Sequence, residues 1–273
     1  MKSVKHLGWL VLALALFLTG CGTDSASTDA EGKEKKGPTP EEILQKSAEA
    51  NENLNSYDMD MTMDMDVKAS GLDQTMTTTA DGTIVMDPLS SKLSMESMGQ
   101  QFDMYIKDNM IYMYEPASDM WMKMDAESEI GASLGTDQVA QPLDEQVQQV
   151  KDLAESIKVS ETDTEYVLDV VVAEDKMMSF MEEQMGAAGE SLESMGDFTF
   201  DKFNYTISID KETNYPKNIK LDMVMKMEDA GEEATVNALM DMNYENYNAT
   251  DSIEIPAEAE SAVDISDQAA ATY

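Results

Sequence analysis

Residues Tyr57 to Val67 have the sequence YDMDMTMDMDV, in which methionine alternates with aspartate or threonine. Successive side chains of a β-strand point to opposite faces, so a strand would place the methionines on one face and the acidic residues on the other. A helix would scatter both sets around its circumference. The stretch therefore predicts a long strand with one apolar and one solvated face.

Similar alternation recurs along the chain and predicts an antiparallel meander with one apolar face. Asp81-Gly82 and Gly99-Gln100 lie where tight hairpins would join neighbouring strands. Strands of about ten residues span about 33 Å, and such long strands curl around a core or cavity. We expect 166–173 to be covered on both faces. The expected strands are 57–67, 72–80, 83–87, 92–98, 101–107, 110–114, 120–124, 166–173, 197–210, 216–228 and 234–247.

Three helices are expected beside these strands. Thr39-Pro40-Glu41-Glu42 predicts the start of the first, because Thr39 can cap it, Pro40 suits its first turn and Glu42 completes a capping box. Apolar residues near helical spacing predict two more helices, at 143–157 and 174–186.

The N-terminal residues 1–20 are typical of a secretory signal, with a short cationic start followed by an apolar run. Leu18-Thr19-Gly20-Cys21 resembles the lipobox of bacterial lipoproteins, and Cys21 is the only cysteine. The resemblance implies cleavage before Cys21, a diacylglycerol on its sulfur, and often an acyl group on the new amino terminus. We therefore expect a protein anchored by lipid to the extracytoplasmic face of the cell membrane.

The rest of the chain divides by composition into three expected parts. Residues 21–38 hold the lipidated Cys21 and a flexible tether of small and charged residues. Residues 39–256 are long enough for one domain with a sizeable core. Residues 257–273 are poor in core-forming residues and predict a disordered acidic tail.

The lipobox, the tether and two further stretches, ILQKSAEANENLNSYDMDMTMDM and DKETNYPKNIKLDMVMKME, resemble an uncharacterised group of Gram-positive lipoproteins. The body of these proteins is similar to the half-barrel of the LolA and LppX lipoprotein and lipid carriers. The resemblance implies an α+β fold, with a long curved antiparallel sheet and helices packed on its concave side. It also implies an apolar cavity that can take an acyl chain.

Composition excludes several classes of function. The chain has 55 acidic residues against 18 lysines and no arginine, for a formal net charge of −37, so it would repel nucleic acid and anionic lipid head groups. His6 is the only histidine and lies in the signal, which leaves the expected mature chain without the residues of Ser-His-Asp, Cys-His or Cys/His zinc sites. No phosphate-binding loop motif is present. We predict a protein that is not an enzyme and needs no cofactor.

The alternating stretch offers two kinds of candidate metal ligand, thioethers and carboxylates. Thioethers suit Cu(I), but methionines spread along one strand would need cross-strand partners to converge on one ion. Oxidant scavenging by exposed methionines is a further alternative. The aspartates from Asp58 resemble a calcium loop, yet the sixth position is Met63 instead of glycine and the twelfth is Ala69 instead of glutamate. We expect a solvated acidic face and no defined metal site.

The 25 methionines favour an adaptable apolar lining over a catalytic site. We predict that the protein binds a lipid or acyl chain in a methionine-rich cavity. The alternative is an envelope interaction protein that is not an enzyme, with a packed interior and an acidic surface that attracts cations. The predicted cavity wall comprises Met61, Met63, Phe102, Met104, Met113, Met122, Met223 and Met225.

Overall fold

The computed structural model describes residues 37–69, 71–116, 118–128, 151–179, 197–229 and 232–266. The chain forms two compact units. Of the described residues, the first unit contains those within 54–128 and 236–266, and the second contains those within 37–53 and 151–235. The expected signal peptide lies outside the described residues, as does Cys21.

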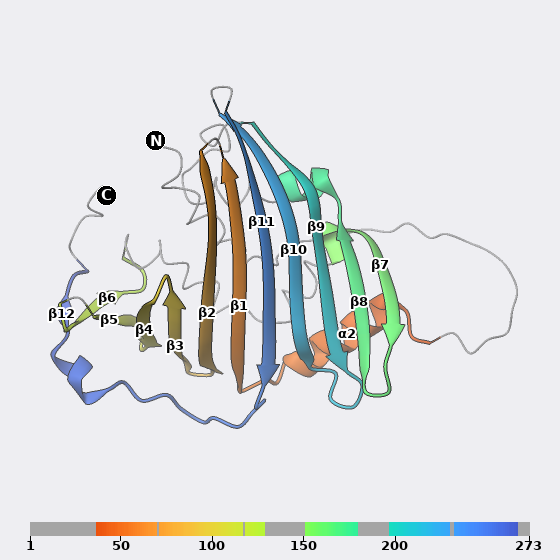
Figure 1. Ribbon diagram of the computed structural model, residues 1–273. Helices are drawn as coiled ribbons and strands as arrows, with labels where there is room; N and C mark the ends of the chain where they lie inside the picture. The colour runs from red at the N-terminus through yellow and green to blue at the C-terminus, as the bar shows by residue number, and fades with distance from the viewer. Residues whose placement is uncertain are drawn as a thin grey trace, which may run out of the picture. The chain divides into compact units, whose positions relative to one another are not determined.

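The first unit is built on a meander of strands in the order β12-β6-β5-β4-β3-β2-β1-β11 (Figure 1). The pairs from β1 to β6 are antiparallel, and β12 pairs with β6 in parallel. Residues 232–235 of β11 belong to the second unit. The elements are β1 (Ser56–Ala69), β2 (Leu72–Met86), β3 (Leu89–Ser97), β4 (Gln100–Lys107), β5 (Met110–Glu115), β6 (Met120–Asp125), β11 (Glu232–Glu245), the short 3-10 helix η2 (Ala257–Ser261) and β12 (Val263–Asp264).

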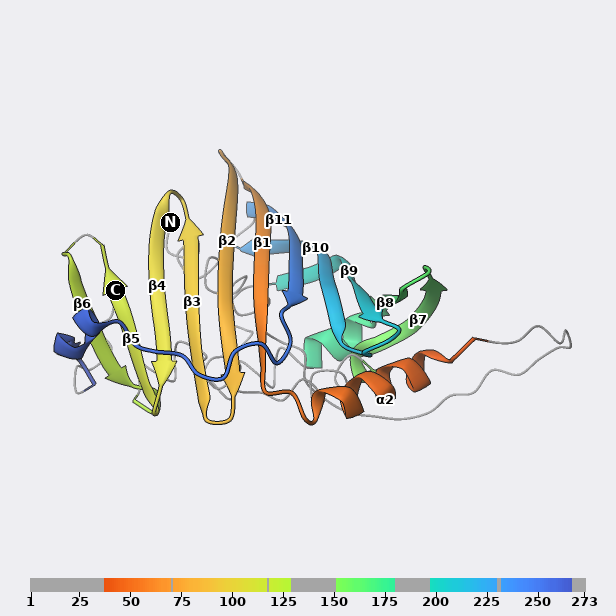
Figure 2. The same ribbon diagram turned by 90° about the horizontal axis from the view of Figure 1, so that it is seen from below.

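Among its described residues, the second unit has four antiparallel strands in the order β10-β9-β8-β7 and one helix of 12 residues, α2. Figures 1 and 2 both show α2 lying along the end of the strands at which β7 and β9 finish. The elements are α2 (Pro40–Asn51), β7 (Ala154–Glu161), β8 (Glu165–Val172), β9 (Asp197–Asp210) and β10 (Pro216–Asp229). The predicted class, an α+β fold on a long antiparallel meander, is confirmed. The placement of helices on a concave side stays a prediction.

The alternating stretch forms β1 as predicted. Met61, Met63 and Met65 are 6–7% exposed, while Thr62 and Asp64 between them are exposed. On the solvated face, Thr77 Oγ1 donates a hydrogen bond to Asp64 at 2.6 Å across the β1–β2 pair. Threonine partners of this kind satisfy carboxylates that would otherwise only repel one another.

The predicted hairpin at Asp81-Gly82 is wrong, because both residues lie inside β2, which is one continuous strand. Gly82 pairs with Leu93 on β3. A Cβ atom at position 82 would lie 2.4 Å from Leu93 Cδ2 and 2.8 Å from the Lys92 carbonyl oxygen. Glycine therefore allows close packing here instead of a turn.

The hairpins that follow occur close to where they were expected. β3 and β4 are joined at Met98-Gly99, where both residues have positive φ, one residue before the predicted Gly99-Gln100. β4 and β5 are joined at Asp108-Asn109, also with positive φ at both residues. Two consecutive left-handed residues are typical of the tight turn that matches strand twist.

The helix predicted at 143–157 is wrong for its last four residues, because residues from Ala154 onward form β7. Residues 174–179 are helical as predicted, and residues 143–150 and 180–186 lie outside the described part of the chain. The prediction that both faces of β8 are covered is also wrong, because Val170 is buried whereas Val171 is 38% exposed.

The C-terminal segment packs on the first unit, so the prediction of a disordered tail is wrong for residues 257–266. Ala259 of η2 is completely buried, and Ile265 N donates to the Lys123 carbonyl oxygen at 2.9 Å. Upstream, Ile253 packs with Val85 and Tyr105. Residues 267–273 lie outside the described residues. No helix among the described residues is long and apolar enough to span a membrane.

Candidate ligand-binding site

The first unit presents a row of apolar side chains across four neighbouring strands. Leu93, Met104, Met113 and Met122 lie directly opposite one another on β3 to β6, and we call these four residues the methionine row. All four are partly exposed. The row continues to Val263 of β12, which pairs with Met122 and is 50% exposed.

One side of the methionine row is supported by a buried cluster. Met104 and Met113 pack against Ile106, Ile111 and Met124, of which the last two are completely buried. Towards the other end of the same strands, apolar side chains become more exposed, with Phe102 at 40% and Met120 at 46%. The row is therefore anchored in the core while its side chains keep accessible apolar surface.

The other predicted wall residues of the first unit differ in exposure. Met61 and Met63 are buried on β1. Met61 pairs with Ala80, which pairs with Met95, which in turn pairs with Phe102, so β1 shares one sheet face with the row. Six of the eight predicted residues thus belong to one apolar face of one unit.

Met223 and Met225 lie in the second unit, on β10, and are almost completely buried. Their cross-strand partners on β9 are Phe203 and Phe200. These phenylalanines belong to an aromatic ladder on β9 with edge-to-face contacts and ring centroids 5.2–5.9 Å apart; we define it as Phe198, Phe200, Phe203 and Tyr205. Burial raises the pKa of Tyr205 far above its ordinary value.

The ladder depends on an irregularity in β9. The register between β9 and β10 shifts between Val224 and Met225, where the pairing passes from Lys202 to Phe200 and leaves Asp201 unpaired. The extra residue keeps Phe200 and Phe203 on the same face although their numbers differ by three. Without the bulge, the two rings would point to opposite faces.

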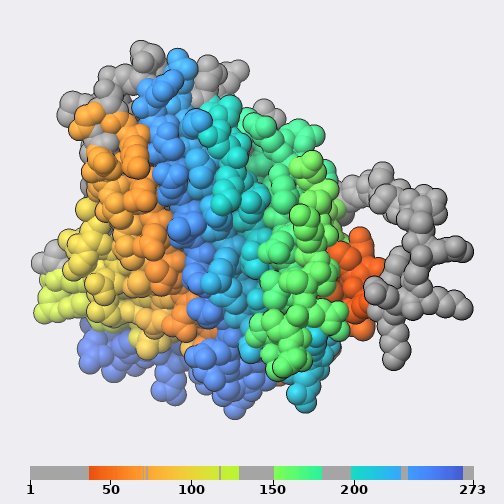
Figure 3. Space-filling model, turned by 45° about the vertical axis from the view of Figure 1, so that its right-hand side comes forward, coloured from red at the N-terminus to blue at the C-terminus, as the bar shows by residue number. Residues whose placement is uncertain are grey.

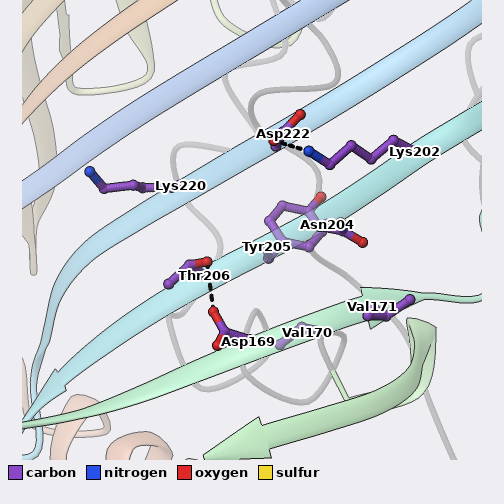
Figure 4. A pocket seen from close by; sticks show the side chains of 9 residues that line it. All are labelled: Asp169, Val170, Val171, Lys202, Asn204, Tyr205, Thr206, Lys220 and Asp222. Atoms are coloured by element: carbon purple, nitrogen blue, oxygen red, sulfur yellow. Dashed lines mark hydrogen bonds and ion pairs between the residues drawn. The ribbon is translucent and has the colours of Figure 1, made fainter. Parts of the chain in front are cut away.

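Figure 3 shows the outer surface of these strands. The opposite face of this unit has a hollow of about 270 Å³ between β8, β9 and β10, and Figure 4 shows the residues that line it. Asp169, Thr206 and Lys220 lie opposite one another in the strand register, and Thr206 Oγ1 donates to Asp169 at 3.0 Å. Lys202 and Asp222 form an ion pair on the same face. The prediction from sequence missed these residues, because they come from three strands and only the register brings them together.

None of the predicted wall residues lines this hollow, so the methionine-rich cavity stays a prediction. The hollow is lined mainly by charged and polar side chains and offers little to an acyl chain. In the part of the chain that the structure describes, no group of three or more His, Cys, Asp or Glu side chains is arranged to hold a metal ion.

Comparison with known proteins identifies the family of this chain. A family model described as a family of unknown function, DUF6612, matches residues 39–264. The chain belongs to DUF6612. The match extends over both units and includes η2 and β12 of the C-terminal segment. No curated protein matches this DUF6612 chain.

Several solved structures are similar to the DUF6612 chain. The lipoprotein LppX of Mycobacterium tuberculosis is 12% identical with a TM-score of 0.42, over 79% of this chain and 100% of that one. A putative outer membrane lipoprotein-sorting protein domain from Vibrio parahaemolyticus is 13% identical with a TM-score of 0.27, over 78% and 93%. A LolA superfamily protein from Nitrosomonas europaea is 8% identical with a TM-score of 0.22, over 77% and 95%. LppX and a LolA superfamily protein, the kinds of carrier that the sequence resembles, are both among these structures.

Proposed function

We propose that the protein is a lipid-anchored extracytoplasmic binding protein that holds a lipid or acyl chain against its methionine-rich sheet face. The observation that supports this most is the methionine row, whose four side chains are apolar, partly exposed and directly opposite one another on neighbouring strands. Contiguous exposed apolar side chains often mark a binding surface.

Methionine suits this role because its side chain is unbranched and polarisable and adapts to chains of different shape. Each ligand methylene buried against it would contribute about 0.8 kcal/mol. Complete burial of a dozen methylenes would contribute about 10 kcal/mol, which opposes a cost of immobilising the ligand of about 4 kcal/mol or more. Recognition would depend on hydrophobic burial, and no chemical reaction is required of the protein.

Anchoring at Cys21 is part of this proposal. Attached acyl chains would hold the body at the membrane although the acidic chain, with a formal net charge of −37 over its full length, repels anionic head groups. The Cys21→Ser variant should carry no covalent lipid, because it lacks the sulfur to which the lipid would be attached. The measurement is the loss of the acyl mass increment on the N-terminal peptide.

A second candidate function is supported by the burial of four predicted wall residues. Met61, Met63, Met223 and Met225 are at most 7% exposed, as expected of a packed interior. In this alternative the protein has no ligand cavity and contacts envelope proteins or cations through its acidic surface.

Native mass spectrometry of the full chain, purified in a mild detergent and followed by organic extraction, separates the two candidates. Extraction removes lipid that is bound non-covalently and leaves the covalent anchor in place. A stoichiometric extractable lipid supports the binding protein. A chain without extractable lipid that also rejects added fatty acids and phospholipids supports the interaction protein.

A further inference from the structure

The hollow between β8, β9 and β10 lies on a face of the second unit that the proposed function does not use. Its volume of about 270 Å³ is close to the lower limit of small-molecule pockets, about 300 Å³, so it suits one small ligand. The strand register arranges its outward side chains in two rows. The first row is Val171, Asn204 and Asp222, and the second row is Asp169, Thr206 and Lys220.

Asn204 lies at the centre of the first row. Its side chain is partly exposed and makes no hydrogen bond to another residue that the structure describes. Figure 4 shows Asn204 on the middle strand, β9, between Val171 of β8 and Asp222 of β10. A carboxamide both donates and accepts hydrogen bonds, so Asn204 can bind the N–H and the carbonyl oxygen of an amide in a ligand.

Val171 gives the first row an apolar end. It is 38% exposed and lies directly opposite Asn204 on the neighbouring strand. Opposite residues of an antiparallel pair have Cβ atoms about 5 Å apart. A ligand amide that bonds to Asn204 can therefore place a methyl group against Val171, and an N-acetyl group combines these two features.

The second row presents hydrogen-bonding groups about 7 Å along the strands from the first. Thr206 Oγ1 donates to one oxygen of Asp169 at 3.0 Å. A carboxylate has about four lone-pair sites, so Asp169 can accept further hydrogen bonds, and the ammonium group of Lys220 carries N–H donors. A sugar ring whose acetamido group lies on the first row would direct its hydroxyl groups to the second.

The charges that line the hollow balance, because Lys202 and Lys220 offset Asp169 and Asp222. This balance is unusual in a chain with 55 acidic residues against 18 lysines. It favours a ligand without net charge. Lys202 already forms an ion pair with Asp222, and hydroxyl groups can bond to the remaining donors and lone pairs of such a pair without separating it.

We propose that the hollow binds an uncharged N-acetylated amino sugar, with its acetamido group on Asn204 and Val171 and its hydroxyl groups on Asp169 and Lys220. The same chemistry is offered by a free sugar and by one unit of a glycan chain. The inference goes beyond the proposed function, because it concerns another face of the protein and another class of ligand.

The test measures binding to the full chain by saturation-transfer NMR, in a detergent without a sugar head group. The probes are N-acetylglucosamine, glucose and alanine. N-acetylglucosamine should bind about tenfold or more tightly than glucose, because glucose lacks the acetamido group that bonds to Asn204. Alanine carries both charges, so tighter binding of alanine than of N-acetylglucosamine would contradict an uncharged ligand.

The decisive variant is Asn204→Leu, which removes the amide at similar volume and should weaken N-acetylglucosamine binding about tenfold. Ser208→Ala is the matched control and should bind like the natural chain. Ser208 lies two residues beyond Thr206 on the same face of β9 and does not line the hollow. If Asn204→Leu does not fold, Asn204→Asp keeps the size of the side chain, loses its N–H donors and should weaken binding several-fold.

Failure of this proposal is distinguishable from failure of the proposed function. A natural chain that does not bind N-acetylglucosamine, or an Asn204→Leu variant that binds it as tightly as the natural chain, would overturn the sugar site. Neither result concerns the methionine row. The trimer of N-acetylglucosamine identifies the source of the ligand: tighter binding than that of the monomer supports a glycan chain, and equal binding supports the free sugar.

Discussion

Single residues determine how closely the strands of the first unit approach. Gly82 faces Leu93 across the β2–β3 pair, and a methyl group at position 82 would overlap both a side chain and a backbone oxygen. Gly82→Ala should lower the free energy of unfolding by about 1–3 kcal/mol, measured by urea denaturation. Adding Leu93→Ala should restore only part of the loss, because the Lys92 carbonyl oxygen still lies 2.8 Å from the new Cβ. Stability equal to that of the natural chain would contradict this packing.

Asp210 links stability to acid pH at the turn between β9 and β10. Hydrogen bonds from the backbone and side chain of Thr213 and the backbone of Glu212 hold the pKa of Asp210 below its ordinary value. A carboxyl group with a lowered folded-state pKa stabilises the fold above its unfolded-state pKa, and that contribution is lost as pH falls through the folded-state value. Asp210→Asn should therefore be less stable than the natural chain above about pH 4, with the difference vanishing as pH falls further. A difference that is independent of pH in urea denaturation at several pH values would exclude this linkage.

Alternation in the sequence predicted which side chains share a face but could not predict how exposed they are. Met61 and Phe102 belong to one cross-strand row, yet Met61 is buried and Phe102 is 40% exposed. Exposure depends on what covers each part of the face, and this is a property of tertiary packing. The predicted cavity residues therefore include packed positions as well as accessible ones.

At the scale of elements, α2 begins with the capping box that the sequence predicted. Thr39 Oγ1 accepts from Glu42 N at 3.2 Å, and Thr39 N donates to Glu42 Oε2 at 2.9 Å. Thr39→Ala should cost about 0.5–2 kcal/mol of unfolding free energy. Glu41→Ala is the control, because Glu41 lies in the same turn without a part in the box. Equal losses for the two variants in urea denaturation would show that charge in the first turn matters more than the cap.

Local patterns identified elements well and their limits less well. The capping box and the alternation of β1 are short-range signals, and both are confirmed. The continuity of β2 through Asp81-Gly82 could not be predicted, because Gly82 is needed for close packing against Leu93 on the neighbouring strand. The bulge at Asp201 was missed for a similar reason, since its effect is visible only in the pairing of β9 with β10.

At the scale of the whole molecule, the C-terminal segment is a structural part of the first unit. η2 buries Ala259 and β12 adds a strand beside β6. A chain ending at Pro256 should therefore be less stable to urea than one ending at Ser266, which keeps every described residue. Composition alone predicted a disordered tail, because the segment has few large apolar residues. The segment is instead held in place largely by backbone hydrogen bonds, which composition does not indicate. Equal stability of the two truncated chains would mean that the packing of η2 and β12 contributes nothing.

The central claim is that a lipid tail lies against the methionine-rich face. The most direct measurement is photo-cross-linking of the full chain with an acyl chain that carries a diazirine, followed by mass spectrometry of its peptides. The account predicts that labels concentrate on the strands of the methionine row, at Met104, Met113 and Met122, and that unlabelled lipid suppresses them. Labels confined to the solvated face of β1, or no specific labelling at all, would contradict it.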